Sequence, residues 1–367
     1  MSRREEPAGR GADGHDTATR AAALRWCVSG YYGAGNLGDE ALLAGMAQGL
    51  RARGVRRLHV LSGDPVASRA AHGLTAHHRL LGLPAALLTC DVLVSGGGGL
   101  LQDATSARSL AYYLAVIRAA RALRRRVVVY GQSLGPLSLA GRRRTARALR
   151  GLPLGLRDAP SLRLAADLGL AAHSVADAAL TLPAPSAATR DALVLVPRGG
   201  TPAATQALLA LGRTALARGL AVEVLACQRS QDAPEVARLA AGLPGLRQLP
   251  NEPPEAVLQA LAGARLVASV RLHGLVLATV AAVPHVGVSY DPKVAGFAER
   301  SGGPCWPAPT DAVEAAALAR ALAAALTAPR LDTAARAALL RDAHQGLDWL
   351  VAAALHRPSS GSAYTTA

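Results

Sequence analysis

The stretch WCVSGYYGAGNLGDE, residues 26–40, is the clearest indication of how this chain folds. Trp26 to Tyr31 reads as a short buried strand, a glycine-rich turn follows it, and a helix is predicted from about Asp39. A strand that passes through a tight turn directly into a helix is typical of proteins in which helices cover a parallel sheet. The stretch therefore predicts an α/β fold.

The same alternation continues on both sides of a Pro/Ala/Ser-rich stretch, residues 182–186, which we interpret as a linker. Further strands are predicted at residues 58–62, 91–95, 127–130, 192–196, 221–226, 265–270 and 285–289. This pattern predicts two Rossmann-like domains facing across a cleft, at residues 23–183 and 190–357. Residues 1–22 are expected to be a disordered tail and residues 358–367 a flexible one. Ligands bind at the carboxyl ends of strands in such sheets, where every motif below falls.

The composition favours an anionic partner, since the formal net charge is +15 and the pI is near 10.9. The alternative is that the arginines are scattered over solvated helix faces. The runs 124–126 and 142–144 are of this solvated kind, although they could touch acidic lipid headgroups. Aromatic residues are only 3% of the chain, so the stacking platforms of single-strand nucleic-acid binders are missing.

Several patterns point to a cytoplasmic protein. The four cysteines form no CxxC pair and suit neither a zinc site nor a disulfide framework. The first residues are polar, without the apolar core of a secretory signal. No uncharged apolar run reaches 18 residues, so no membrane span is predicted.

The only lysine, Lys293, stands in YDPKVAGF, residues 290–297, which also contains the only phenylalanine, Phe297. An ammonium group is a compact charge whose pKa can shift, whereas a guanidinium stays charged and planar. A lysine kept in so arginine-rich a chain is a candidate for chemistry that Arg cannot perform. The alternative is that a single lysine simply has to stand somewhere.

Glycines at positions 33, 35 and 38 match the spacing GxGxxG. Glycine lets main-chain N–H groups approach a ligand at the positive end of a helix. A carboxylate at the helix start, from Asp39 or Glu40, would partly occupy such an anion site. A dinucleotide site, a substrate-binding loop and a purely structural turn therefore all remain open. The candidate substrate-binding residues here are Gly33, Asn36, Asp39 and Glu40.

Four consecutive glycines, residues 96–99, follow a predicted buried strand. Ordering four glycines costs conformational entropy, so their presence needs a reason. One reason is close approach of the main chain to a ligand at Gly97 and Gly98. The alternative is a crowded turn between strand and helix that has no room for side chains. Gln102 and Asp103 then stand where they could hydrogen-bond sugar hydroxyls.

Two further strand ends supply polar candidates. Gln132 and Ser133 lie in GQSLGP, residues 131–136, directly after a strand. Arg157 follows another short strand, where it could clamp a phosphate or carboxylate. The alternative for Arg157 is an ion pair with its neighbour Asp158.

Arg271 and His273 lie in SVRLHG, residues 269–274, at the transition from a buried strand to a helix. Histidine exchanges protons near neutral pH, and arginine can hold an anion at a helix N-terminus. A lone histidine is more often a core residue, but this one has an arginine partner and a predicted place in the cleft.

Together these motifs resemble the polysaccharide pyruvyl transferases, specifically their CsaB-like branch. The resemblance rests on GYYGAGNLGDE, SGGGGLLQD, GQSLGP, VRLHGL and VSYDPKVAGF, which run in the family's order from about Trp26 to Phe297. It implies a fold like that of GT-B glycosyltransferases. It also implies transfer of the enolpyruvyl group of phosphoenolpyruvate onto two hydroxyls of a hexose, which forms a cyclic ketal and releases phosphate. In the CsaB-like branch the acceptor is a cell-wall polysaccharide, and the ketal helps to anchor surface-layer proteins.

Carried over by position, the resemblance assigns catalytic roles to Arg271, His273 and Lys293. Arg157 matches the family's RD element less closely, and Tyr290 and Asp291 belong to its YDPK motif. The chain departs from the family's usual GQGIGP at Ser133 and Leu134, and from SGGGS at Gly99. No cofactor is implied, because phosphoenolpyruvate is itself the donor substrate. The sequence shows no cluster of metal-ligating residues, so metal dependence is not implied.

The sequence thus predicts a cytoplasmic enzyme, and its basic charge leaves open a place at the inner face of the membrane. Its first domain would hold a lipid-linked or polymeric hexose and its second domain phosphoenolpyruvate. No nucleic-acid partner is expected, and the basic charge allows peripheral contact with an acidic membrane surface. Two alternatives remain: a GT-B glycosyltransferase that uses a nucleotide sugar, and a non-enzymatic module that binds polyanions.

Overall fold

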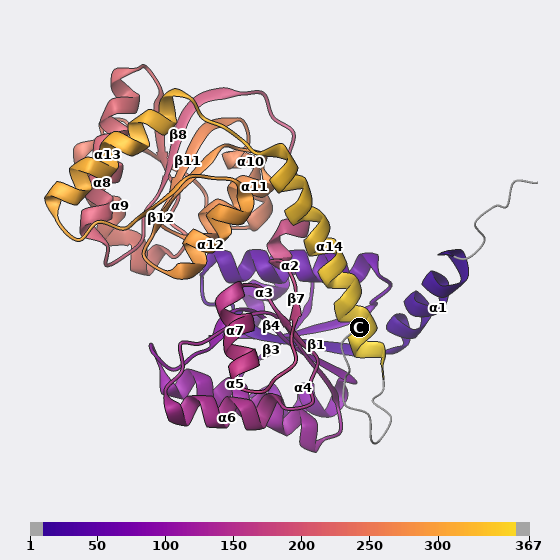
Figure 1. The fold of residues 1–367 in the computed structure, drawn as a ribbon. Helices are drawn as coiled ribbons and strands as arrows, with labels where there is room; N and C mark the ends of the chain where they lie inside the picture. Colours follow the sequence, from indigo (N-terminus) through magenta and orange to yellow (C-terminus); the bar gives the residue numbers. More distant parts are fainter. Residues whose placement is uncertain (1–9, 357–367) are drawn as a thin grey trace, which may run out of the picture.

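The computed structural model describes residues 10–356 as two α/β domains, each built on one parallel sheet (Figure 1). The first sheet has the strand order β3-β2-β1-β4-β5-β6-β7. Its strands are β1 (Arg25–Tyr32), β2 (Arg57–Ser62), β3 (Thr75–His78), β4 (Val92–Leu101), β5 (Arg126–Leu134), β6 (Leu154–Leu156) and β7 (His173–Ser174). The connecting helices are α2 (Leu37–Ala52), α3 (Pro65–His72), α4 (Leu83–Thr89), α5 (Ala107–Ala122), α6 (Leu139–Leu149) and α7 (Ala159–Asp167).

The second sheet has the order β10-β9-β8-β11-β12-β13. Its strands are β8 (Arg190–Val196), β9 (Ala221–Val224), β10 (Arg247–Gln248), β11 (Ala264–Ser269), β12 (His285–Ser289) and β13 (Cys305–Pro307). The helices are α8 (Pro202–Ala217), α9 (Arg229–Gly242), α10 (Pro254–Leu261), α11 (Leu272–Val280), α12 (Pro292–Ser301), α13 (Ala312–Thr327) and α14 (Thr333–Leu355). All the strand pairs are parallel, so the predicted α/β class is confirmed.

The strands form where the sequence places runs of β-branched and other apolar residues. In the centre of the first sheet, Val28 of β1 lies beside Val60 of β2 and Val94 of β4, and all three are buried. Helices cover both faces of a parallel sheet, so its central strands have no solvated side. This explains why these strands read as continuous apolar runs instead of alternating ones.

The two domains join through α2 and the short 3₁₀ helix η1 (Ala178–Thr181). Leu37 of α2 and Leu180 of η1 belong to the same apolar cluster as Leu277 of the second domain. At the start of α2 the Leu37 N–H donates to the Cys227 carbonyl, with 2.8 Å between N and O. Residues 183–189, which connect the sheets along the chain, form neither helix nor strand.

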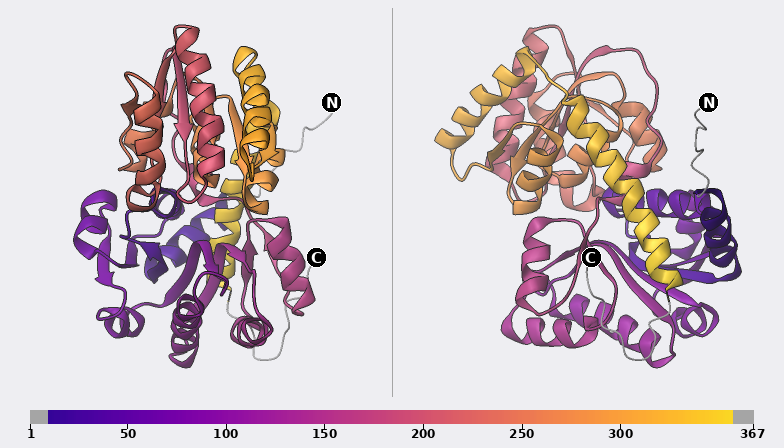
Figure 2. Two further views of the ribbon diagram at one scale, coloured as in Figure 1. Left: turned by 90° about the vertical axis from the view of Figure 1, so that its left-hand side faces the viewer. Right: turned by 45° about the vertical axis from the view of Figure 1, so that its right-hand side comes forward.

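The last helix, α14, returns from the second domain to the first (Figure 2). Its residue Leu339 packs in the interdomain cluster, whereas Leu347 and Leu350 pack with Trp26 and Val28 of the first domain. The helix therefore bridges the two domains, and the segment predicted as the second domain also supplies core to the first.

The expectation of a disordered tail over residues 1–22 is wrong for its second half. Helix α1 runs from Arg10 to Ala23. Ala21 is buried, its carbonyl accepts a hydrogen bond from the indole of Trp26, and the Arg20 guanidinium donates to the Leu355 carbonyl at the end of α14. The polar composition concealed these long-range contacts. Residues 1–9 and the predicted tail at 358–367 lie outside the described residues.

Between residues 10 and 356, no helix is long and apolar enough to span a membrane.

Candidate active site

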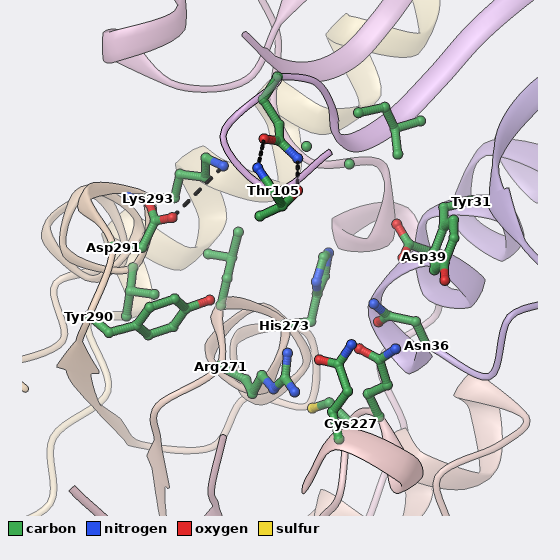
Figure 3. A pocket seen from close by; sticks show the side chains of 18 of the residues that line it. Tyr31, Asn36, Asp39, Thr105, Cys227, Arg271, His273, Tyr290, Asp291 and Lys293 are labelled. Atoms are coloured by element: carbon green, nitrogen blue, oxygen red, sulfur yellow. Dashed lines mark hydrogen bonds and ion pairs between the residues drawn. The ribbon is translucent and has the colours of Figure 1, made fainter. Parts of the chain in front are cut away.

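A cavity of about 350 Å³ lies between the two domains, at the carboxyl ends of both sheets. Its first-domain walls come from the turns after β1, β4 and β6, and its second-domain walls from the turns after β9, β11 and β12. Figure 3 shows Asp39 and Tyr31 on one side, Lys293 and Asp291 on the other, and His273 and Arg271 between them. The cavity is in the size range of small-molecule sites, roughly 300–1,000 Å³.

Most of the predicted site residues line this cavity. They are Asn36, Asp39, Gly98, Gln102, Arg157, Arg271, His273, Tyr290, Asp291 and Lys293. Segments far apart in the sequence thus meet at one place, as expected for the carboxyl ends of two facing sheets.

Asn36, which lines the cavity, fixes the start of α2. Its side-chain oxygen accepts a hydrogen bond from the Gly38 N–H at 3.0 Å, and its main chain pairs with Gln228 of the second domain. The helix therefore begins at Leu37, with Asn36 as the N-cap in place of an acidic residue.

Asp39, in the first turn of α2, is buried but faces the cavity. Burial raises its pKa to about 7; Arg157 opposes this rise, while the nearby Glu40 and Asp177 carboxylates add to it. A carboxyl group with this pKa can either donate or accept a proton near neutral pH.

The glycines after β4's apolar residues form part of the strand, which continues to Leu101 instead of ending near Ser95. Gly98 has a φ of +96°, and a Cβ there would lie 2.9 Å from an Asp39 carboxylate oxygen. A Cβ on Gly99 would lie 3.2 Å from Lys293 Nζ. The run thus brings main chain close to the charged residues of the cavity.

His273 is packed between the domains. A Cβ on Gly38 would lie 2.1 Å from its Nδ1, so the ring occupies the space in which any side chain at position 38 would stand. The last glycine of the GxGxxG spacing therefore makes room for His273. This favours the substrate-binding interpretation of the loop over a dinucleotide site.

Asp177, which the sequence did not suggest, serves both Arg157 and His273. Arg157 donates to it from Nη1 at 2.7 Å, and both side chains are buried. His273 Nε2 lies 3.5 Å from the same carboxylate oxygen, Oδ2, too far for a well-formed hydrogen bond. Burial alone would raise the pKa of Asp177, but His273, Arg157 and the Ala179 N–H lower it to about 2. Asp177 is therefore ionised near neutral pH.

A second buried acid, Asp232 of α9, holds Arg271. The guanidinium forms an ion pair with Asp232 Oδ1, and the Asp232 carboxylate also accepts from the N–H groups of Gly199 and Gln228, at 3.0 Å each. Arg271 Nε is buried without a hydrogen-bond partner. The arginine is thus held in place on one side and retains an unused donor.

Lys293 is held more loosely. Its Nζ lies 3.9 Å from Asp291 Oδ2, while Asp291 Oδ1 caps α12 by accepting from the Lys293 N–H at 2.9 Å. The neighbouring Tyr290 ring stacks under the Arg198 guanidinium, 4.0 Å from the ring centroid. Because the contact of Lys293 Nζ with Asp291 is long, the ammonium can reorient towards an anion.

Gly33 and Glu40 do not line the cavity. One Glu40 oxygen accepts from the Gly33 N–H at 2.8 Å, and the other meets His72 Nε2 at 2.8 Å. A Cβ on Gly33 would collide with Ser62 and Asp64. Both residues therefore stabilise the turn after β1 and do not face the cavity.

Three further predicted residues contact the residues that line the cavity but do not line it themselves: Gly97, Gln132 and Ser133. Gly97 packs on Leu42. The buried Gln132 amide accepts from the Leu100 N–H and donates to the Gly96 carbonyl, which fixes the glycine strand. Ser133 accepts from Arg157 Nε at 3.0 Å and so orients that arginine.

Asp103 also lies off the cavity, where both carboxylate oxygens accept from Ser138. Arg157 does not pair with Asp158; the Asp158 carboxylate instead caps α7 by accepting from Ser161. Arg157 therefore turns inward to Asp177, which removes the alternative of a salt bridge between neighbours.

The family model for polysaccharide pyruvyl transferases matches residues 36–292. A search of the curated proteins found no match. Among solved structures, Anabaena Alr3699/HepE in complex with UDP and glucose aligns with a TM-score of 0.55 at 15% identity, covering 89% of this chain and 95% of that one. The Methanocaldococcus jannaschii UDP-GlcNAc 2-epimerase aligns at 0.54 and 10% identity, covering 82% and 93%. S. aureus MnaA with UDP aligns at 0.57 and 9% identity, covering 88% and 91%.

These structural similarities concern the fold alone and confirm the expected GT-B-like arrangement. The family match extends from the cap of α2, across both walls of the cavity, to the first residue of α12. Since it covers more than half of the sequence, the chain belongs to the polysaccharide pyruvyl transferase family.

Proposed function

We propose that this enzyme transfers the enolpyruvyl group of phosphoenolpyruvate to two hydroxyls of one hexose. The product is a cyclic ketal, and inorganic phosphate leaves. The vinyl carbon of the donor gains a proton and becomes a methyl group, the two hydroxyl oxygens bond to C2, and the bond from C2 to the phosphate oxygen breaks. Of the two hydroxyl protons, one balances the methyl group and the other leaves with phosphate.

The observation that carries this proposal is the convergence of Arg157, Arg271, Lys293 and His273 on one small cavity. Phosphoenolpyruvate bears a phosphate and a carboxylate, so its site needs several cations. Asp177 and Asp232 hold the two arginines in fixed positions, whereas Lys293 is freer to move. Lys293 therefore suits the departing phosphate, whose charge increases during the reaction.

His273 suits the proton transfer to the vinyl carbon. It faces the cavity, and its Nε2 lies 3.5 Å from the ionised carboxylate of Asp177. Asp39 suits the hydroxyl side of the reaction, since its pKa of about 7 lets it take a proton from an attacking oxygen. Two proton-transfer groups match a reaction in which protons are exchanged at both carbon and oxygen.

The acceptor fits the first-domain side of the cavity. Asn36 and Tyr31 present amide and hydroxyl groups there, and Gln102, whose amide bonds to Thr105, lies next to the glycine run. These groups match sugar hydroxyls better than they match a phosphate. We take the acceptor to be a lipid-linked or polymeric hexose of a cell-wall polysaccharide made in the cytoplasm, as in the CsaB-like branch, with surface-layer anchoring as its biological use.

The direct test measures phosphate release from phosphoenolpyruvate with hexose-containing, lipid-linked acceptors, together with the mass gained by the acceptor. We expect His273→Ala to lower turnover by about 10²-fold or more, and the exposed His344→Ala to leave it unchanged. Full turnover in His273→Ala would remove the assigned role of this histidine.

The competing function is a glycosyltransferase reaction with a nucleotide sugar, which the GT-B-like fold also permits. Thermal unfolding distinguishes the two, because a ligand that binds only the folded state raises the melting temperature. We expect phosphoenolpyruvate to protect the protein and UDP-glucose to have little effect; the reverse result would favour the competing function.

A further inference from the structure

Three large apolar side chains stand exposed at one edge of the first domain. Val66 is 75% exposed, Leu80 58% and Leu81 87%. Val66 is in the first turn of α3, just after β2, and the two leucines follow β3. Since β2 and β3 are parallel neighbours, all three leave the sheet at its carboxyl edge. We call this group the apolar rim.

The rim is held in an ordered turn. His78 Nδ1 accepts from the main-chain N–H groups of Leu80 and Leu81, at 3.3 and 3.2 Å, and the Gly82 N–H donates to the His78 carbonyl at 2.8 Å. The main-chain N–H groups of this turn are therefore hydrogen-bonded within the protein. Its two leucine side chains remain in water, which is less favourable than burying them.

The rim lies beside the active-site cavity. The Arg79 N–H donates to the Ser62 carbonyl, and the Arg79 guanidinium lies 5.8 Å from the ring centroid of Tyr31, which lines the cavity. The Tyr112 hydroxyl also donates to the Arg79 carbonyl at 2.8 Å. A large partner on the rim would thus sit at the cavity's first-domain side.

The positive charge is concentrated in the same domain. Residues 23–183 contain 20 arginines against eight acidic residues, a net charge of +12. Residues 190–357 contain 16 basic and 13 acidic residues, a net charge of +3. Arg69 follows Val66 by three residues on α3 and Arg79 directly precedes Leu80, while the nearest carboxylate in sequence, Asp64, is used to cap α3.

We propose that the apolar rim docks on an anionic lipid bilayer. A few aliphatic side chains that project from a basic surface suit shallow insertion between acidic headgroups. A second copy of this chain would bring two strongly positive domains together, which charge repulsion opposes. Docking would present the cavity to a lipid-linked sugar, and in this respect the inference rests on the proposed function.

The basic run at residues 124–126 is a weaker candidate for lipid contact. Arg125 donates to the Leu88 carbonyl and Arg126 to the Ala354 carbonyl, each near the C-terminus of a helix. These guanidinium groups are thus engaged by the protein itself. They also lie at the amino end of β5, away from the cavity.

Vesicle flotation tests the docking without donor or acceptor, so its result is independent of whether the proposed reaction occurs. The full chain is mixed with vesicles of phosphatidylcholine alone or of equal parts phosphatidylcholine and phosphatidylglycerol. We expect it to float with the anionic vesicles only, and less as salt is added. The double variant Leu80→Gln/Leu81→Gln should reduce this binding about tenfold or more.

Leu88→Gln is the matched control, because Leu88 is 59% exposed and lies towards the other end of α4; its binding should equal that of the wild type. Unchanged thermal midpoints confirm that the variants are folded. Equal flotation of the double variant and the wild type would overturn the proposal. A second outcome would also overturn it: the wild type does not bind the vesicles and forms a dimer, whereas the double variant is monomeric. The rim would then bind a second copy of the chain.

Discussion

At the scale of single residues, Asp39 makes the folded protein sensitive to pH. Its pKa is raised from 3.8 to about 7, so the folded state binds a proton more tightly than the unfolded state does. This contribution to stability is complete below pH of about 4 and is lost as the pH rises through about 7.

We therefore expect Asp39→Asn to unfold less readily than the wild type above neutral pH, and the advantage to shrink as the pH falls towards about 4. A difference of three pKa units corresponds to about 4 kcal/mol at most. Denaturant unfolding at several pH values measures it. The variant should also lose turnover, and a difference in stability independent of pH would contradict the raised pKa.

Lys293 provides a second test at this scale. Lys293→Arg keeps the positive charge but replaces a compact ammonium by a planar fork, beside a glycine whose Cβ position lies 3.2 Å from Nζ. We expect turnover to fall at least tenfold while phosphoenolpyruvate still protects against thermal unfolding. Arg320→Lys, the opposite exchange on α13 of the second domain, is the control. Full activity of Lys293→Arg would show that charge alone is required.

The sequence predicted the cations of the site but missed the acids that hold them. Arg157, Arg271 and Lys293 each follow a strand end, a position that reads directly from the order of elements. Asp177 and Asp232 instead reach the site from a 3₁₀ helix and from α9, through contacts over 20 to 96 residues of sequence. Such contacts depend on how the two domains pack against each other. A local sequence pattern carries no information about that packing.

At the scale of elements, the meeting of α2 with α11 depends on Gly38. A Cβ at this position would come within 2.1 Å of His273 Nδ1. We expect Gly38→Ala to displace the imidazole and to lower turnover by about 10²-fold, even though Ala is the better helix former by up to about 1 kcal/mol.

Gly296→Ala is the matched control, because Gly296 lies within α12 and a Cβ there meets nothing within 4 Å. It should keep activity and gain slightly in stability. Turnover assays and thermal unfolding of both variants decide the question; an active Gly38→Ala enzyme would show that His273 need not stay in this position.

Strands were easier to predict than their ends. The apolar runs placed β1, β2 and β12 correctly, because burial on both faces requires them. The glycine run of β4 was expected to end its strand, yet Gln132 of β5 holds it in the sheet with hydrogen bonds to Leu100 and Gly96. Tertiary contacts here override the low strand propensity of glycine.

At the scale of the whole molecule, α14 couples the two domains. Leu350 is fully buried among first-domain residues, although the helix begins in the second domain. Leu350→Ala should therefore lower the free energy of unfolding by about 3 kcal/mol. Thermal or denaturant unfolding measures this, with the exposed Ala352→Ser as the control. A negligible effect would mean that α14 does not hold the domains together.

The lone lysine has a practical consequence. Apart from the α-amino group, Lys293 is the one primary amine in the chain, and it lines the active-site cavity. Reductive methylation with ¹³C-formaldehyde would place a single side-chain NMR label there without any mutagenesis. The protein thus contains its own spectroscopic reporter, whose chemical shift should change on addition of phosphoenolpyruvate if the donor binds beside Lys293 as we propose.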